Sequence, residues 1–142
     1  MEKYLLDSDT LIHYFKSKFR LEERIQKAGI ENCFVSEITI AELIYGAEYS
    51  TRKEKHLREV DMTIERFVIL PISNALKIYG KERARLRNAG TPVGSNDIFI
   101  AATAIKHDLI MVSGNTKDMG RIENLQLEDW TKPEHNEFLP KP

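Results

Sequence analysis

The stretch Tyr4-Leu5-Leu6-Asp7-Ser8-Asp9-Thr10-Leu11-Ile12 carries two carboxylates between two apolar segments, close to the start of the chain. Its first residues predict a short buried strand that ends just before Asp7. A helix is expected from about Thr10, with Asp9 as a candidate for its capping residue. A charge at the end of a buried strand needs a partner or a function, and parallel α/β sheets bind ligands beyond the carboxyl ends of their strands.

Short apolar runs alternate with helical patterns along the rest of the chain. Further strands are expected at CFVS (33–36), FVILP (67–71), LIMVS (109–113) and, as a possible fifth, LQLEDW (125–130). Helices are expected at 21–29, at 37–50 after a Ser36 cap, at about 52–65, from a Ser73 cap to about Asn88, and at 97–107 after a Ser95 or Asn96 cap. The alternation predicts one α/β domain over residues 1–132, with a central parallel sheet of four to five strands and helices on both faces. The Pro-containing segment 133–142 is expected to be a loose tail.

Composition narrows the class of protein. A chain of 142 residues suffices for one domain, and 42% hydrophobic with 30% charged residues is typical of a globular protein. No apolar run reaches the ~18 residues that suggest a membrane span, and the N-terminus does not resemble a signal peptide. The single cysteine, Cys33, cannot form an intrachain disulfide, so a cytoplasmic location is expected. With a net charge of −1, binding to nucleic acid requires a local basic patch or a metal ion.

Acidic and amide side chains recur where the predicted strands end. Asp7 follows the first strand, Glu42 lies on the helix after the second, Asp97 opens the helix before the fourth, and Asn115 and Asp118 follow the fourth. Each alone has a simpler interpretation, such as a solvated helix residue, a first-turn acid or a turn residue. Together at one sheet edge the carboxylates would repel one another, and a divalent cation with oxygen ligands resolves that repulsion.

Four blocks of sequence resemble, in order and spacing, the PIN-domain ribonucleases, and most closely the VapC toxins of bacterial toxin–antitoxin pairs. The blocks are LLDSDTLIHYF, ITIAELIYGAE, GTPVGSNDIFIAATAI and LIMVSGNTKDMGRIENLQLEDW, and they cover nearly the whole chain. The resemblance implies that Asp7 and Asp97 bind Mg²⁺ or Mn²⁺ and that Glu42 is a third metal-site residue. It implies a fourth site residue at Asn115 or Asp118, which the sequence does not separate.

The resemblance also implies an activity and partners. The expected activity is metal-dependent hydrolysis of RNA phosphodiesters, with tRNA or another structured RNA as substrate. The expected partners are a cognate antitoxin that covers the active site and a second copy of the chain in a homodimer. The helix LKIYGKERARLRNAG (76–90) supplies candidate RNA contacts, and an equally simple interpretation of it is a solvated helix face; the candidate contacts are Lys77, Lys81, Arg85 and Arg87.

Two alternatives follow from the same residues. A non-catalytic protein with this fold could bind only RNA or antitoxin, although retention of Asp7, Glu42 and Asp97 argues against it. A phosphatase of the haloacid-dehalogenase type also has Asp-x-Asp after a strand. That motif requires a small residue before its Thr, whereas Thr10 directly follows Asp9 here.

Overall fold

The central element of the fold is a five-stranded, fully parallel sheet. The computed structural model describes residues 1–133, so residues 134–142 of the predicted tail lie outside the described part. The strands are β1 (Tyr4–Leu6), β2 (Cys33–Ser36), β3 (Val68–Leu70), β4 (Ile110–Val112) and β5 (Leu127–Glu128). Their order is β3-β2-β1-β4-β5, and all four neighbouring pairs are parallel. The predicted α/β fold class is confirmed.

Helices connect the strands and cover the sheet. Within residues 1–133 the α-helices are α1 (Ser8–Phe15), α2 (Leu21–Ala28), α3 (Glu37–Tyr49), α4 (Lys53–Arg66), α5 (Leu76–Asn88), α6 (Ser95–Lys106) and α7 (Thr116–Met119). Two short 3₁₀ helices occupy Ile30–Asn32 and Ser73–Ala75. In this part of the chain, no helix combines the length and apolar character needed to cross a membrane.

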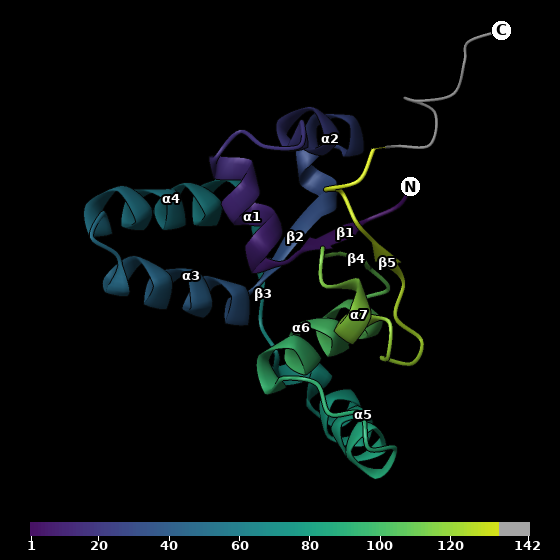
Figure 1. Cartoon of the computed structure of the whole chain (residues 1–142). Coiled ribbons are helices and arrows are strands. Elements are labelled where there is room, and N and C mark those ends of the chain that lie inside the picture. The colour runs from purple at the N-terminus through teal and green to yellow at the C-terminus, as the bar shows by residue number, and fades with distance from the viewer. Residues whose placement is uncertain (134–142) are drawn as a thin grey trace, which may run out of the picture.

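The two faces of the sheet carry separate hydrophobic clusters, because successive strand residues point to opposite faces. Leu6 packs with residues of α1, α2, α3 and α4 on one face. Its neighbour Leu5 packs with residues of α5, α6 and α7 on the other face. In Figure 1, α3 and α4 form an antiparallel pair on one side of the sheet, and α5 and α6 lie together on another side. Helices therefore lie on both faces, as the sequence predicts.

The order of the strands creates a switch point between β1 and β4. The chain proceeds from β1 outward through β2 to β3, and then returns to place β4 on the other side of β1. Such a switch point leaves a crevice at the carboxyl ends of the two strands, where ligands bind in open α/β sheets. Asp7 follows β1 and residues 113–115 follow β4.

The first helix begins earlier than the sequence predicts. Helix α1 starts at Ser8, and its N-cap is Asp7, whose side chain accepts a hydrogen bond from the backbone N–H of Thr10. The proposed Asp9 cap is wrong, since Asp9 already lies in the first helical turn. A carboxylate at the strand end thus caps the helix and faces the crevice.

Two further predicted caps are wrong. Ser73 lies in the 3₁₀ turn before α5, and Ala75 occupies the N-cap position of that helix. Helix α6 is preceded by Gly94 without a side-chain cap, because Ser95 is already helical and its hydroxyl contacts the hydroxyl of Tyr79 at 2.8 Å. The Ser36 cap of α3 is confirmed, with the backbone N–H of Ile38 donating to its hydroxyl at 3.1 Å. The short α7 was not predicted.

Candidate active site

Asp7 lies buried at the crevice between β1 and β4, with only 7% of its surface exposed. Its backbone N–H donates to the carbonyl of Val112 at 3.2 Å, which extends the pairing of the two strands. Burial raises the pKa of its carboxyl, and hydrogen bonds with Ser113 and Thr10 partly oppose that rise. A buried carboxylate held by neutral donors retains unbalanced negative charge.

Thr10 and Ser113 contact Asp7 through their hydroxyl groups. The sequence analysis did not assign either residue to the site. Thr10 donates from its hydroxyl to the Val112 carbonyl at 3.1 Å, so it joins α1 to β4. The hydroxyl of the buried Ser113 contacts Asp7 and accepts from the backbone N–H of Asn115 at 3.0 Å. The sequence signal was present, because each hydroxyl lies within four residues of the end of a strand.

Glu42 reaches the site from α3 and is oriented by α1. The hydroxyl of Ser8 donates to Glu42 Oε1 at 2.7 Å. Ser8 directly follows Asp7, so one short segment of chain contributes a buried carboxylate and fixes a second one from another helix. Ser8 is a further site residue that the sequence analysis did not name.

Asp97 lies in the first turn of α6, where the helix dipole favours a negative charge. Its carboxyl nevertheless has a pKa raised to about 6, first by burial and then by the negative charges of Glu42, Asp7, Asp118 and Asp9. These four groups come from three segments that are distant in sequence: Asp7 and Asp9 at the start of α1, Glu42 on α3 and Asp118 on α7. The structure therefore brings the predicted acidic residues together around Asp97.

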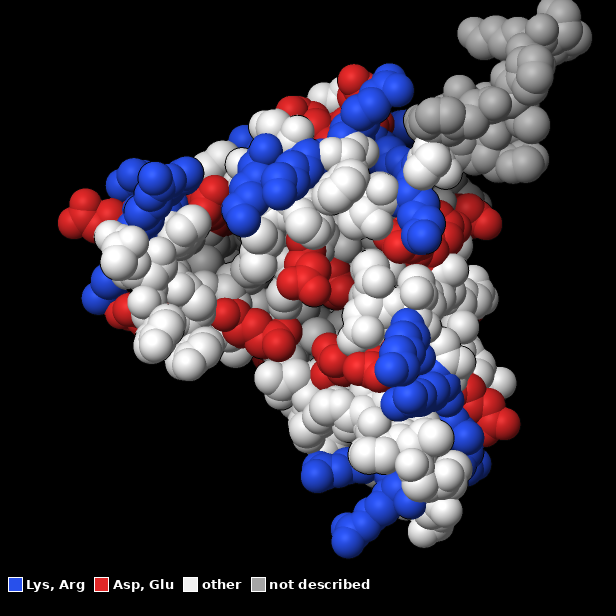
Figure 2. All heavy atoms as spheres, viewed as in Figure 1, with Lys and Arg blue, Asp and Glu red and all other residues white. Residues whose placement is uncertain are grey.

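A small cleft of about 120 Å³ lies among these groups. Its lining residues are Asp7, Ser8, Asp9, Glu42, Asp97, Ile100 and Asn115. Asn115 lines the cleft directly. Asp118 is not among the lining residues, and its Oδ2 lies 3.4 Å from the Asn115 amide nitrogen. Figure 2 shows acidic side chains gathered in the hollow at the centre of this face, with Lys and Arg side chains around the margins.

The side chains of the cleft fit a divalent cation. Carboxylate and amide oxygens are the ligands that Mg²⁺ takes in proteins, usually one or two carboxylates with several waters. Among residues 1–133, no group of three or more His, Cys, Asp or Glu side chains is arranged to hold a metal ion by itself, so a bound ion would have to take further ligands from water, the Asn115 amide or a substrate. An open set of donors agrees with an ion that keeps part of its water shell. The raised pKa of Asp97 reports the negative charge that such an ion would offset.

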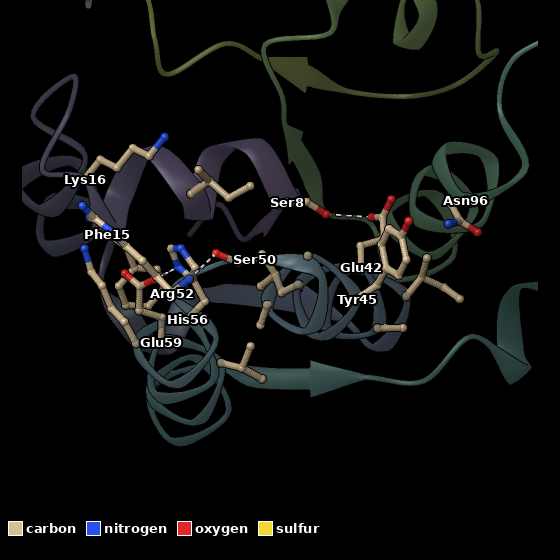
Figure 3. A pocket seen from close by; sticks show the side chains of 18 residues that line it. Ser8, Phe15, Lys16, Glu42, Tyr45, Ser50, Arg52, His56, Glu59 and Asn96 are labelled. Carbon is tan, nitrogen blue, oxygen red and sulfur yellow. Dashed lines mark hydrogen bonds and ion pairs between the residues drawn. The ribbon is translucent and has the colours of Figure 1, made fainter.

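A larger groove of about 1010 Å³ runs from the cleft between α1 and the α3–α4 pair. Ser8 and Glu42 line both the cleft and the groove, so the two are continuous. Apolar side chains line its length, among them Ile12, Leu43 and Val60. Figure 3 shows Glu42 and Ser8 at one end of the groove and Lys16, Arg52 and the His56–Glu59 pair at the other. The groove thus changes from acidic near the cleft to largely basic at its far end.

The four predicted RNA contacts all lie on α5, but they differ in environment. Lys77, Lys81 and Arg87 are exposed. Arg85 is half-buried and forms an ion pair with Glu82 at 2.6 Å between Nε and Oε1. Three of the four side chains are accessible to a ligand, and the fourth is engaged inside the protein.

Comparison with known proteins identifies the family to which the chain belongs. The sequence matches the PIN domain over residues 4–125. The chain belongs to the PIN-domain family. Within that family it is 38% identical over 132 residues to a Salmonella typhimurium protein named tRNA(fMet)-specific endonuclease VapC, which covers 92% of this chain and 99% of the relative. It is 35% identical to Ribonuclease VapC1 of Haemophilus influenzae, covering 91% of this chain and 98% of that protein.

Solved structures of PIN-domain proteins agree with these sequence relatives. The chain matches DNA-bound VapBC from Salmonella typhimurium with a TM-score of 0.85 and 36% identity, covering 92% of this chain and 99% of that one. It matches VapBC-1 from nontypeable Haemophilus influenzae with a TM-score of 0.81 and 34% identity, covering 91% and 98%. The predicted family, a VapC-type PIN-domain ribonuclease of a toxin–antitoxin pair, is confirmed. The phosphatase alternative loses its basis.

Proposed function

We propose that this PIN-domain ribonuclease is a divalent-metal-dependent endoribonuclease whose Mg²⁺ or Mn²⁺ is held by Asp7 and Asp97, with Glu42 across the cleft. The observation that carries the proposal is the convergence of Asp7, Glu42 and Asp97 on one cleft, where burial and neighbouring carboxylates raise the pKa of Asp97 to about 6. A domain that gathers these charges without a cation is less stable than one that does not. Asn115 adds an amide oxygen on the side of β4.

The residues of the chain divide the work of phosphodiester hydrolysis. The chemistry that a divalent ion supplies in such a site is a lowered pKa for water and compensation of charge on phosphoryl oxygens. Thr10 and Ser113 hold Asp7 rigid at the crevice. Glu42, oriented by Ser8, is placed to accept a proton from or align the attacking water. Such attack by water leaves a 5′-phosphate and a 3′-hydroxyl, whereas attack by the ribose 2′-hydroxyl leaves a cyclic phosphate.

The proposed substrate is a structured RNA, with tRNA as the first to test. The Salmonella relative named for tRNA(fMet) supports that choice. Exposed cations on α5, at Lys77, Lys81 and Arg87, offer contacts for the phosphates of a folded RNA that reaches past the cleft. Their side chains are separate from the acidic cleft, so binding and cleavage can be altered independently.

The proposed protein partner is an antitoxin that lies in the groove and covers the cleft, a proposal that the similar VapBC structures support. The groove is continuous with the acidic residues and is lined by apolar side chains, which suits an amphipathic segment. Its charges favour a partner with a basic group toward Glu42 and acidic groups toward Lys16, Arg52 and Lys55. Homodimerisation and a cytoplasmic location remain parts of this proposal.

The deciding experiment is cleavage of a total tRNA pool by antitoxin-free protein with Mg²⁺, with Mn²⁺ and with chelator. Asp7→Asn and Asp97→Asn are compared with Asp61→Asn, a matched loss of an exposed acid on α4. We expect metal-dependent cuts with 5′-phosphate ends in the wild type and in Asp61→Asn, and none in the two cleft variants. Cleavage that persists in chelator and in both cleft variants would overturn the metal site. Metal-dependent stabilisation without cleavage of any RNA would favour the non-catalytic alternative.

A further inference from the structure

Glu82 is a buried carboxylate outside the acidic cleft, and all its contacts are to donors. Its Oε1 accepts from Arg85 Nε at 2.6 Å, and its Oε2 accepts from a terminal guanidinium nitrogen of Arg85 at 2.9 Å. Oε2 also accepts from the backbone N–H of Glu123 at 2.6 Å. The same guanidinium donates to the backbone carbonyl of Arg121 at 2.7 Å. One ion pair on α5 therefore fastens two backbone positions of the loop after α7.

The fastened loop connects directly to the site. The backbone N–H of Arg121 donates to the Asp118 carbonyl at 3.1 Å, and its guanidinium lies 3.4 Å from Asp118 Oδ1. The backbone N–H of Ile122 donates to the carbonyl of the buried Met119 at 3.1 Å. Asp118 in turn contacts Asn115, which lines the cleft. We call residues 115–123 the β4–β5 arm.

Met119 and Ile122 anchor the arm in the hydrophobic cluster on this face, but its regular secondary structure is short. Helix α7 has only four residues, and Asn115 before it makes no side-chain cap. The strand that follows, β5, has two residues and lies at the edge of the sheet. The buried side chains leave the backbone after α7 without regular hydrogen-bond partners. The ion pair on α5 supplies such partners to the Arg121 carbonyl and the Glu123 N–H.

Arg85 is poorly suited to bind RNA while it makes these contacts. Its Nε and a terminal nitrogen point at Glu82 and Arg121, which uses the fork that would engage a phosphate. If Arg85 turned to bind a ligand, the buried Glu82 carboxylate would keep only the backbone N–H of Glu123 as a donor, which is unfavourable for a buried charge. Its exposed neighbours Lys81 and Arg87 carry no such contact in the described structure.

We propose that Glu82 and Arg85 are a positioning pair that holds the β4–β5 arm, and with it Asn115 and Asp118, against the acidic cleft. Arg85 is then not an RNA contact, unlike the sequence-based assignment. The inference rests on the proposed function for its effect on cleavage, because arm position matters to the rate only if the cleft is the site of hydrolysis. The first part of the proposal, that the pair holds the arm in place, does not depend on any substrate.

The test compares Arg85→Met with Arg58→Met, a matched replacement of an exposed arginine on α4. Steady-state cleavage is measured at several salt concentrations, and hydrogen exchange of the backbone amides is measured in both variants. We expect Arg85→Met to lower kcat roughly tenfold, as loss of an orienting contact does in metal sites, with KM for RNA and its salt dependence unchanged. Amide exchange is expected to accelerate within residues 115–123, and Arg58→Met is expected to match the wild type.

Two outcomes overturn the proposal. A raised KM with a weaker salt dependence and an unchanged kcat would make Arg85 a phosphate contact. Unchanged exchange in the arm of Arg85→Met would show that the arm is held without the pair. If the wild type cleaves no RNA, the proposed function fails by itself, and the exchange of residues 115–123 still decides whether the pair holds the arm.

A second variant guards against general unfolding. Arg85→Lys keeps the positive charge, but one ammonium group cannot reproduce the forked contact with both Glu82 and the Arg121 carbonyl. We expect near wild-type melting, faster exchange confined to the arm, and a lowered kcat. Wild-type exchange and wild-type kcat in Arg85→Lys would overturn a role for the fork.

Discussion

Two acidic residues on neighbouring helices, Asp97 on α6 and Glu82 on α5, show opposite electrostatic designs. Asp97 faces other carboxylates, and its pKa is raised to about 6 by burial and then by Glu42, Asp7, Asp118 and Asp9. Glu82 is more fully enclosed, yet the Arg85 guanidinium and a backbone N–H hold its pKa below the usual value. The difference separates a group kept reactive from a group that joins two parts of the fold.

The comparison teaches that burial alone does not mark a functional acid. Both carboxylates are removed from water, but only one is left with a charge that its surroundings do not balance. An unbalanced charge in a crevice indicates a missing cation or substrate, whereas a balanced one indicates structure. Neutralising Asp97 should therefore lower activity and raise metal-free stability, whereas breaking the Glu82–Arg85 pair should lower stability.

The largest effect is expected at the cleft, for Asp7→Asn. The amide keeps an oxygen for the Thr10 backbone N–H, so the fold is retained, while a charged ligand is lost. Several kcal/mol of charge stabilisation correspond to a loss of at least ~10³-fold in kcat/KM. Single-turnover cleavage of the preferred RNA at saturating Mn²⁺ measures it. A loss below tenfold would move the metal away from Asp7.

At the paired acid, the expected effect is on stability. Arg85→Met leaves Glu82 buried without its cation, and breaking fully buried pairs costs about 3–5 kcal/mol. Because the Arg85 side chain is 39% exposed, we expect the free energy of unfolding to fall by clearly less than this. Urea denaturation at neutral pH measures the change. The double variant Arg85→Met with Glu82→Met is expected to recover part of it, and failure to recover would mean that packing, not charge, causes the loss.

Removing a charge from the acidic cleft should raise the stability of the metal-free protein, unlike removal of Arg85. Asp97→Asn removes one of the mutually repelling carboxylates, so the metal-free protein is expected to gain free energy of unfolding. Mn²⁺ should then stabilise the wild type more than the variant, because the variant has lost a ligand. Melting with and without Mn²⁺ tests both signs. Equal metal-free stability of the two proteins would show that the acids of the cleft do not repel one another appreciably.

Most of the sheet could be predicted because each strand is an apolar run followed by a turn or a helix signal. Asp7, Glu42, Asp97 and Asn115 could also be placed at one edge, since carboxyl ends of parallel strands share an edge. Their order around the cleft could not, because it depends on β4 returning to the other side of β1. Asn115, which lines the cleft, also could not be separated from Asp118, which does not, because both follow β4 in one short segment.

The hydroxyl residues that contact the acids of the cleft could not be predicted from the sequence, for a different reason. Ser8, Thr10 and Ser113 have hydroxyls that suit a cap or a turn as well as a carboxylate, so their type alone does not indicate a partner. On α5, Arg85 has the i,i+3 spacing to pair with Glu82, which Lys81 does not have. Only the packing of the loop after α7 against α5 adds the Arg121 carbonyl and Glu123 as partners of Arg85. Local patterns predict elements, and contacts between distant segments decide what a charge does.

The smallest effect that still separates the two acids is the dependence of stability on pH without metal. Asp97 has a folded-state pKa raised from 3.8 to about 6, so the folded state gains stability as the pH falls from about 6 toward 4. Glu82 has a lowered pKa, so its contribution is complete above its usual 4.5 and is lost as the pH falls through the lowered folded value.

Metal-free stability should therefore rise and then fall as the protein is acidified from pH 7. Asp97→Asn is expected to reduce the gain in stability between about pH 6 and 4 and to leave the loss at lower pH unchanged. Glu82→Gln is expected to reduce part of the loss at lower pH and to leave the gain unchanged. Urea midpoints at half-unit intervals from pH 3 to 7 resolve the two limbs. A rise that survives in Asp97→Asn would assign it to Asp7, whose pKa burial also raises, and a fall unchanged in Glu82→Gln would mean that other paired carboxylates control acid unfolding.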